Sequence, residues 1–237
     1  MTEIHITMVV HSLSKEPAEF WANINDPRIF LHLFLHSKKE SVEAMCEDMA
    51  GERNVYYYPY HENRGLARSW NQGMITARQM GADVVMVAND DIRASFEDVW
   101  EIARTAQAHP ECFMASGMGL DLTTGEHKDM LLALAAFNPI AFDKLQVNNR
   151  LFDEQFVPIY FEDLDLYHRA KLAGIPAICT PHTHIHHIGS ATRKVVADET
   201  AFFKDFDTNK ARYIAKWGGD GTRGSEVFTL PYNKEQA

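Results

Sequence analysis

Two adjacent carboxylates, Asp90 and Asp91, follow an apolar segment at residues 84–88, with only Asn89 between the segment and the pair. Five apolar residues are too few to span a membrane, but they fit a strand that is buried on both faces. Ligands of open α/β sheets bind outside the carboxyl ends of the strands, where adjacent acids favour a divalent cation. The pattern predicts a metal ion that holds a diphosphate. The alternative is a polar turn that caps a helix at residues 96–108.

A second group of acids lies at residues 153–165 and suits acid–base chemistry. Glu162 and Asp163 precede a helical pattern, and one of them could act as a general base toward a hydroxyl acceptor. Helix spacing turns Asp165 away from Asp163, so we expect Asp165 to be solvated or paired with Arg169. The alternative is that these acids only complement the helix dipole, which contributes at most about 1 kcal/mol.

Four histidines lie within six residues, at His182, His184, His186 and His187. In an extended segment the first three share one face and His187 lies on the other. One of them could complete a metal site with Asp91, because histidine is a common metal ligand. The alternative is that most are partly buried and hydrogen-bonded, which we expect for at least two. Zinc bound by this run alone is not expected, because structural zinc sites usually draw ligands from several segments.

Residues 63–73 join a predicted strand to a helix and contain Gly65 between Arg64 and Arg68. Glycine permits a tight turn, and the free amides of a helix N-terminus suit a phosphate or pyrophosphate. The two arginines could add charge-assisted hydrogen bonds. On spacing alone, a plain helix entry with solvent-facing arginines is favoured.

The elements that must position these groups alternate between strands and helices. Strands are predicted at residues 4–10, 29–35, 55–59 and 84–88, and helices at 17–24, 41–49, 66–80 and 96–108. The second half is predicted to contain a strand at 113–117, an unassigned apolar segment at 130–142, helices at 164–173 and 201–217, and an extended segment at 177–188. The alternation predicts an α/β fold with a mostly parallel, doubly wound sheet flanked by helices.

Composition limits the class of protein further. The 237 residues suit a single domain, and a net charge of −10 argues against broad binding to nucleic acid or anionic lipid. Three widely spaced cysteines fit a reducing compartment. We find no signal-peptide pattern and no apolar run of transmembrane length. These features predict a cytoplasmic protein, for which peripheral docking to a membrane stays open.

In their order along the chain, these motifs resemble those of family-2 type glycosyltransferases with the GT-A fold, particularly the rhamnosyltransferase-like branch. Four blocks carry the resemblance: residues 62–73, Asn89-Asp90-Asp91, residues 152–169 and residues 187–192. The resemblance implies one Rossmann-like GT-A domain over residues 1–217, followed by a C-terminal tail at residues 218–237.

The resemblance also implies a function and a set of roles. The protein would be an inverting glycosyltransferase that uses Mn²⁺ or Mg²⁺ and moves a sugar from a nucleoside-diphosphate sugar to a hydroxyl acceptor. Asp91 would bind the metal together with His187, with His186 as a competitor, and Asp163 beside Glu162 would be the catalytic base. The implied donor-binding residues are Val10, His11, Ser12, Asn63, Gly65, Arg68, Asn89 and Asp90.

Two departures from the family leave the donor open. The family often has an aspartate after its second strand that contacts the base or ribose, whereas residues 35–39 contain no acid. The usual Pro and Asn turn after the first strand is also absent, and the sequence there is His-Ser-Leu-Ser at residues 11–14. His11, Ser12 or His36 could take part in recognising the base. The acceptor could be a glycan, a protein, a small molecule or a modified nucleobase.

Two alternative functions remain. One is a sugar-nucleotidyltransferase-like enzyme, against which the lack of a glycine-rich basic loop after the first strand argues. The other is a non-catalytic module of the same fold that binds a nucleotide or carbohydrate. Such a module would not need the base Asp163.

Overall fold

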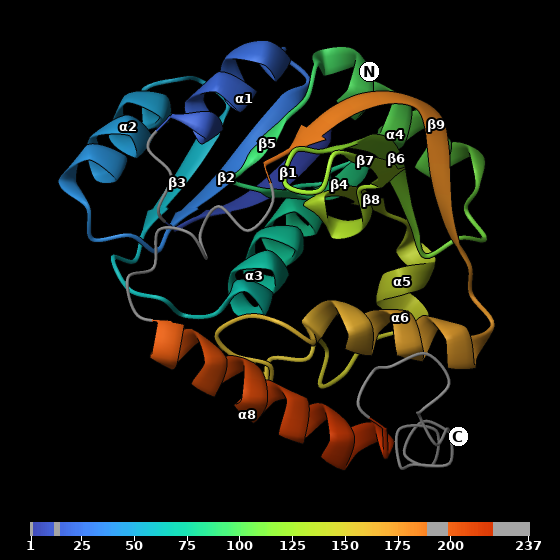
Figure 1. Ribbon diagram of the computed structural model, residues 1–237. Helices are drawn as coiled ribbons and strands as arrows, with labels where there is room; N and C mark the ends of the chain where they lie inside the picture. Colours follow the sequence, from blue (N-terminus) through green and yellow to red (C-terminus); the bar gives the residue numbers. More distant parts are fainter. Residues whose placement is uncertain (1, 12–14, 189–198, 220–237) are drawn as a thin grey trace.

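A nine-stranded sheet forms the centre of the protein in a computed structural model that describes residues 2–11, 15–188 and 199–219 (Figure 1). The strand order is β3-β2-β1-β4-β8-β6-β9-β5, and β7 pairs with β6. The strands are β1 (Ile4–Val10), β2 (Ile29–Leu35), β3 (Val55–Pro59), β4 (Val84–Asn89), β5 (Ile92–Arg93), β6 (Met114–Asp121), β7 (Glu126–Asp129), β8 (Leu134–Phe137) and β9 (Ala177–His187).

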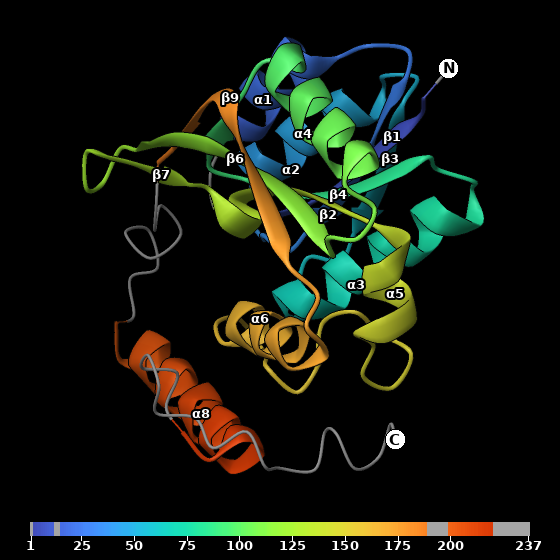
Figure 2. The same cartoon turned by 90° about the vertical axis from the view of Figure 1, so that its right-hand side faces the viewer.

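Helices cover both faces of this sheet (Figures 1 and 2). They are α1 (Glu16–Ile24), α2 (Glu40–Ala50), α3 (Leu66–Gln79), α4 (Phe96–Ala108), α5 (Pro139–Lys144), α6 (Glu162–Ala173) and α8 (Glu199–Trp217), with a 3₁₀ turn, η1, at Leu131–Ala133. One hydrophobic cluster joins α1, α2 and α4 to one face of the sheet, and a second joins α3, α5 and α6 to the other. The predicted α/β fold with a mostly parallel sheet flanked by helices is confirmed.

The parallel half of the sheet, β3-β2-β1-β4, follows the sequence prediction closely. All seven residues of β1 are buried, as expected of a strand covered on both faces. Gly73 of α3 lets this helix lie against β1, because an added Cβ would collide with the side chain of Thr7. The carboxyl ends of β1 and β4 therefore meet at one edge of a well-packed sheet.

The other half differs from the prediction in several details. The unassigned segment 130–142 divides into η1, the antiparallel strand β8 and the short helix α5. Strand β6 continues beyond the predicted residue 117 to Asp121 and forms a hairpin with β7, which was not predicted. The short strand β5 was also not predicted. It pairs Ile92 with His187, and so joins the acidic segment to the histidine-rich strand.

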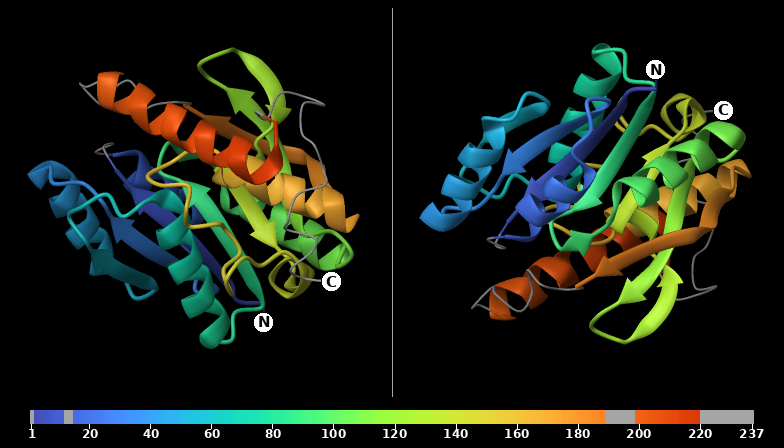
Figure 3. Two further views of the ribbon diagram at one scale, coloured as in Figure 1. Left: turned by 90° about the horizontal axis from the view of Figure 1, so that it is seen from below. Right: turned by 90° about the horizontal axis from the view of Figure 1, so that it is seen from above.

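Helix α8 lies outside α6, on the side away from the sheet (Figures 1 and 2), and crosses α6 and the preceding segment when seen from below (Figure 3). A small apolar cluster joins them, formed by Phe156, Phe161, Tyr213 and Trp217. The helix ends at Trp217, and of the predicted C-terminal tail the structure describes only residues 218–219. Among the described residues, no helix combines the length and the apolar character that crossing a membrane requires.

Candidate active site

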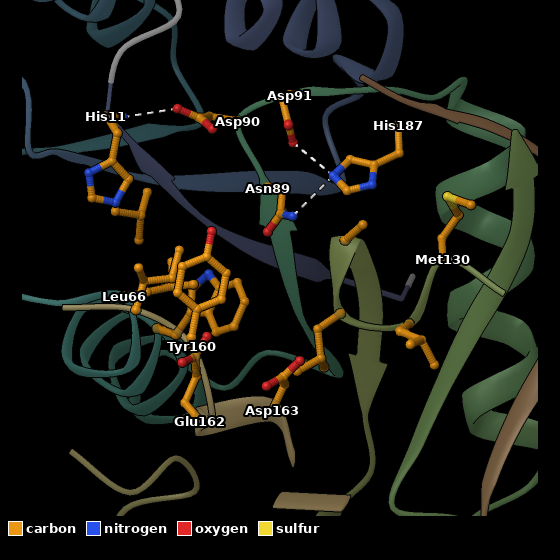
Figure 4. A pocket seen from close by; sticks show the side chains of 16 residues that line it. His11, Leu66, Asn89, Asp90, Asp91, Met130, Tyr160, Glu162, Asp163 and His187 are labelled. Carbon is orange, nitrogen blue, oxygen red and sulfur yellow. Dashed lines mark hydrogen bonds and ion pairs between the residues drawn. The ribbon is translucent and has the colours of Figure 1, made fainter. Parts of the chain in front are cut away.

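A cavity of about 310 Å³ opens at the carboxyl ends of β1 and β4. Asn89, Asp90 and Asp91 line one side together with His11 and His187, and Glu162 and Asp163 line the opposite side (Figure 4). Leu66, Trp70, Ile159, Tyr160 and residues 130–133 form much of the wall between them. The two groups of acids that lie some seventy residues apart in the sequence thus face a single cavity.

Asp91 and His187 are in direct contact. His187 Nε2 lies 3.0 Å from Asp91 Oδ1 and 3.4 Å from Asn89 Nδ2 (Figure 4). The backbone fixes this approach, because β5 pairs with the end of β9 and the Ile188 N–H donates to the Asp91 carbonyl at 2.9 Å. The alternative role of Asn89-Asp90-Asp91 as a helix cap is excluded. Ser95 caps α4 instead, in a reciprocal capping box with Asp98.

The residues at this position fit a divalent cation. Asp91 offers a buried carboxylate and His187 an imidazole nitrogen, and both line the cavity. Within the described part of the chain, no cluster of three or more His, Cys, Asp or Glu could hold a metal ion. Magnesium-like ions are commonly held by one or two protein carboxylates plus substrate phosphates. The site therefore suits an ion that binds together with a diphosphate rather than alone.

His11 connects Asp90 to the end of β1. The His11 backbone N–H donates to Asp90 Oδ2 at 2.9 Å. Its ring packs edge-on against His36, with 5.0 Å between the ring centroids. Burial lowers the pKa of His11 to about 3, with a further contribution from His36, and burial lowers the pKa of His36 to about 4. Both rings are therefore neutral at pH 7, and they can recognise a ligand by hydrogen bonds rather than by charge.

Glu162 and Asp163 form the first turn of α6. Burial, and next the charge of Asp163, raise the pKa of Glu162 well above its usual value. Burial also raises the pKa of Asp163, although the Leu164 N–H donates to Asp163 Oδ1 at 2.7 Å and opposes the shift. The raised pKa of each carboxyl makes it a stronger proton acceptor than an exposed acid, which is what a general base requires.

The backbone before this pair adopts a conformation that bulky residues rarely take. Tyr160 and Phe161 have φ values of 76° and 72°, both in the left-handed region. Asn209 of α8 holds them there, since its Nδ2 donates to the carbonyls of Ile159 at 2.9 Å and Tyr160 at 3.3 Å. Arg212, one turn later, donates to the carbonyls of Gln155 and Val157. We call these contacts from Asn209 and Arg212 the α8 clamp.

A buried ion-pair network anchors α6 below the cavity. Asp165 pairs with Arg169 at 2.8 Å, which is the second of the two predicted alternatives, and both side chains are fully buried rather than solvated. Trp217 Nε1 and Lys216 Nζ also contact Asp165 Oδ1, at 2.8 and 2.6 Å. Lys216 in turn contacts Asp153 at 2.7 Å. This network fixes the start of α6 relative to α8.

The segment between β3 and α3 lies apart from the acids. The Gly65 N–H donates to Asn63 Oδ1, and a Cβ on Gly65 would lie 2.7 Å from Val157 Cγ1. The Leu66 N–H donates to the Pro158 carbonyl at 2.9 Å, so this amide is not free to bind a phosphate. Arg68 lies in a separate groove, 3.9 Å from Glu154. Gly65 thus permits close packing of two segments.

The remaining predicted residues divide into three cases. Val10 is buried in the core, whereas its neighbour Val9 lines the cavity. Ser12 lies outside the described residues. His186 shares the exposed face of β9 with His182 and His184, and it does not line the cavity. The expectation that at least two of the four histidines are partly buried is therefore wrong, because only His187 is.

Sequence reasoning missed several residues of the cavity wall. Residues 130–133 belong to the apolar segment that the sequence left unassigned, and they line the cavity. Tyr160 had no signal in the sequence, because a left-handed backbone at an aromatic residue follows no pattern of residue types. Leu66 and Trp70 fell on the predicted apolar face of α3, which gave no indication that they reach a cavity.

No protein-family model matches the chain, and no curated protein matches it either. Among solved structures, it is similar to a mannosyltransferase from Pyrobaculum calidifontis, determined in complex with GDP-Man and Mn²⁺. The TM-score is 0.57 at 14% sequence identity, and the match covers 90% of this chain and 64% of the mannosyltransferase. The chain thus spans less than two thirds of that protein's length. The likeness shows the fold, which is the Rossmann-like GT-A fold of glycosyltransferases.

Proposed function

We propose that the protein is a divalent-metal-dependent glycosyltransferase that transfers a sugar from a nucleoside-diphosphate sugar to a hydroxyl acceptor with inversion. The observation that carries the proposal is the cavity itself. It brings the contacting pair Asp91 and His187 together with Glu162 and Asp163, so a diphosphate site and a base face one space. The fold shared with a mannosyltransferase supports the same class of reaction.

Asp91 and His187 are the residues that would hold Mn²⁺ or Mg²⁺. The exposed position of His186 on the other face of β9 favours His187 over it. When bound, such an ion stabilises the negative charge of a leaving diphosphate. Asn89, Asp90 and His11 line the same end of the cavity and would contact the donor. The neutral ring of His11, which lines the cavity, suits recognition of an uncharged group, such as a nucleobase or ribose, by hydrogen bonds, while the His36 ring packs edge-on against it.

Asp163 would act at the other end of the cavity. Its carboxylate takes the proton of the acceptor hydroxyl while the acceptor oxygen bonds to the anomeric carbon of the sugar. The bond from that carbon to the diphosphate oxygen breaks on the opposite side, which inverts the configuration. Burial raises the pKa of Asp163 and so strengthens it as a base. Burial and the charge of Asp163 raise the pKa of Glu162, which disfavours a second negative charge beside Asp163.

Calorimetric titration with UDP, GDP, dTDP and CDP tests the metal and donor part of the proposal. Each nucleotide is titrated with Mn²⁺ and again with EDTA, first against the natural protein and then against Asp91→Ala. We expect one nucleotide to bind only with Mn²⁺, and this binding to disappear in Asp91→Ala.

Asp143→Ala is the matched control, because Asp143 is an exposed aspartate of α5 outside the cavity. It should bind the nucleotide as the natural protein does. Absence of binding under both conditions would contradict the proposal. Tight nucleotide binding that is equal with Mn²⁺ and with EDTA would show that Asp91 does not bind a metal required by the donor.

A further inference from the structure

A second cavity of about 300 Å³ adjoins the first. The two share Met130, Leu131 and His187 as lining residues. The second cavity extends from there to the β6–β7 hairpin, where Asp121, Thr123, Thr124 and Lys128 line it. A molecule that places one end beside Asp163 can therefore extend past Leu131 into the second cavity.

Leu131 stands at this junction in a strained conformation. Its φ is 47°, in the left-handed region, and its side chain is 45% exposed. Asp129 maintains the strain, because Asp129 Oδ1 accepts from the Leu131 N–H at 2.8 Å and from Ser116 Oγ at 2.5 Å. Backbone strain at a bulky residue costs about 1–3 kcal/mol and is concentrated at functional sites. An exposed leucine held in this way between two cavities indicates a surface for a ligand.

The side chains of the second cavity combine charged, hydroxyl and apolar groups. Lys128 Nζ contacts Asp121 Oδ2 at 2.6 Å, and this contact lowers the pKa of Asp121 to about 2. Asp121 Oδ1 also accepts from the backbone N–H groups of Thr123 and Thr124, so its position is fixed. An ammonium group has three donors, and its pairing with Asp121 uses one of them. Thr123 and Thr124 line the same cavity, and the Thr123 hydroxyl donates to the Ile188 carbonyl at 2.6 Å, so toward a ligand it can act as an acceptor.

This mixture matches a sugar ring, which has hydroxyl groups around its edge and C–H groups on its faces. Leu131 and Met130 supply an apolar surface for a face, while Lys128, Asp121 and the threonines supply donors and acceptors for the edge. A nucleobase needs an aromatic platform for stacking. The described residues that line the second cavity include no Phe, Tyr or Trp, which disfavours a nucleobase.

We propose that the second cavity is an acceptor subsite and that the acceptor is an oligosaccharide. Its terminal sugar would present a hydroxyl to Asp163, and the next sugar would occupy the second cavity against Leu131 and Lys128. This inference rests on the proposed glycosyltransferase function and narrows its acceptor to one chemical class.

An array of mono-, di- and trisaccharides tests the inference, with the full chain in Mn²⁺ and the nucleotide that binds it. We expect binding of at least one disaccharide or trisaccharide and much weaker binding of its terminal monosaccharide. Lys128→Ala should weaken the oligosaccharide about tenfold, the loss expected for a hydrogen bond to a charged group. Leu131→Gly should weaken it as well, while relieving the backbone strain, because glycine favours the left-handed region.

Leu122→Ala is the control for these two variants. Leu122 is also 45% exposed and lies in the same hairpin, but it does not line the second cavity. Its oligosaccharide binding should match that of the natural protein. Oligosaccharide binding that survives both Lys128→Ala and Leu131→Gly would overturn the inference.

Two further outcomes separate this inference from the proposed function. If the natural protein binds a nucleotide with Mn²⁺ but no oligosaccharide on the array, the acceptor inference fails and the transferase proposal stands. If it binds no nucleotide under any condition, both fail.

Discussion

The two ends of the cavity are built in different ways. At the end proposed to hold the metal, here called the metal end, Asp91 and His187 are placed by backbone pairing within one sheet, through β4, β5 and β9. At the base end, Glu162 and Asp163 follow two residues in a strained backbone, which side chains of α8 hold from outside the sheet. The metal end thus depends on sheet register, whereas the base end depends on the α8 clamp. Substitutions at one end should therefore impair metal-dependent nucleotide binding, and substitutions at the other end should impair transfer, independently of each other.

The largest expected effect isolates the base end. Asp163→Asn keeps the size and hydrogen-bonding shape of the side chain but cannot accept the proton. Transfer should fall by a factor of about a hundred or more, as removal of a general base predicts. Metal-dependent nucleotide binding, measured by calorimetry, should persist, since Asp163 lies at the opposite end of the cavity from Asp91 (Figure 4). Unchanged turnover in Asp163→Asn would show that Asp163 is not the general base.

A pair of neighbouring histidines tests the metal end. His187→Ala should weaken Mn²⁺-dependent nucleotide binding about tenfold or more, a loss in the range seen when groups that support a metal site are removed. His186→Ala is the matched control, because His186 is adjacent in sequence but lies on the exposed face of β9. Its affinity should stay within about twofold of that of the natural protein. A larger loss of nucleotide affinity in His186→Ala than in His187→Ala would show that the other face of β9 holds the ion.

The α8 clamp predicts a defect confined to the base end. Asn209→Ala removes the two hydrogen bonds to the carbonyls of Ile159 and Tyr160. We expect transfer to fall about tenfold or more as a result. Looser packing would expose Asp163 to water and bring its raised pKa down, so the acidic limb of the rate profile should move to lower pH.

Thr208→Ala serves as the control for this variant, because Thr208 is the preceding residue of α8 and its hydroxyl contacts only the Lys204 carbonyl of the same helix. Nucleotide binding should be equal in all three proteins. If Asn209→Ala weakens nucleotide binding as much as transfer, the clamp supports the whole fold rather than the base.

The pH dependence of stability should have opposite signs for a buried histidine pair in the sheet and for the two acids of the base end. His5 and His32 lie in β1 and β2, and their rings contact each other at 2.9 Å. Burial lowers their pKa values to about 4 and about 3, so the folded state binds fewer protons than the unfolded state below pH 6.5. Each should therefore remove about 1.4 kcal/mol of stability per pH unit as the pH falls from 6.5 toward the folded pKa.

Glu162 and Asp163 have raised pKa values and contribute with the opposite sign, since their folded forms bind protons more readily. Urea unfolding at pH 7, 6 and 5 measures the sum. His32→Gln should flatten the loss of stability on acidification, while His182→Gln, at an exposed position of β9, should leave it unchanged. If the free energy of unfolding changes with pH equally in His32→Gln and in the natural protein, the proposed contribution of the buried histidine pair is contradicted.

The sequence predicts the metal end better than the base end, for physical reasons. The strands β1 to β4 are short apolar runs with clear boundaries, so their bounds and their common carboxyl edge could be predicted. The approach of His187 to Asp91 was implied by the family resemblance and not by local spacing. It depends on β5, whose two residues are too few to show a periodic pattern.

The base end depends on contacts that leave no local pattern. The bonds from Asn209 to Ile159 and Tyr160 join residues about fifty positions apart, from a side chain to the backbone. The burial of Asp165 likewise depends on Lys216 and Trp217, which no spacing rule connects to α6. The predicted i+4 pairing with Arg169 was correct because it lies within one helix.

The central claim is that both ends of the cavity serve a single reaction. Release of nucleoside diphosphate from a sugar nucleotide tests it most directly, with GDP-Man as the first donor and UDP-, dTDP- and CDP-sugars after it. We predict that the natural protein releases the diphosphate only with Mn²⁺ or Mg²⁺. Asp91→Ala should abolish the release, and Asp163→Asn should lower it by a factor of about a hundred or more while still binding the nucleotide. Metal-independent release, or undiminished release in Asp163→Asn, would contradict the claim.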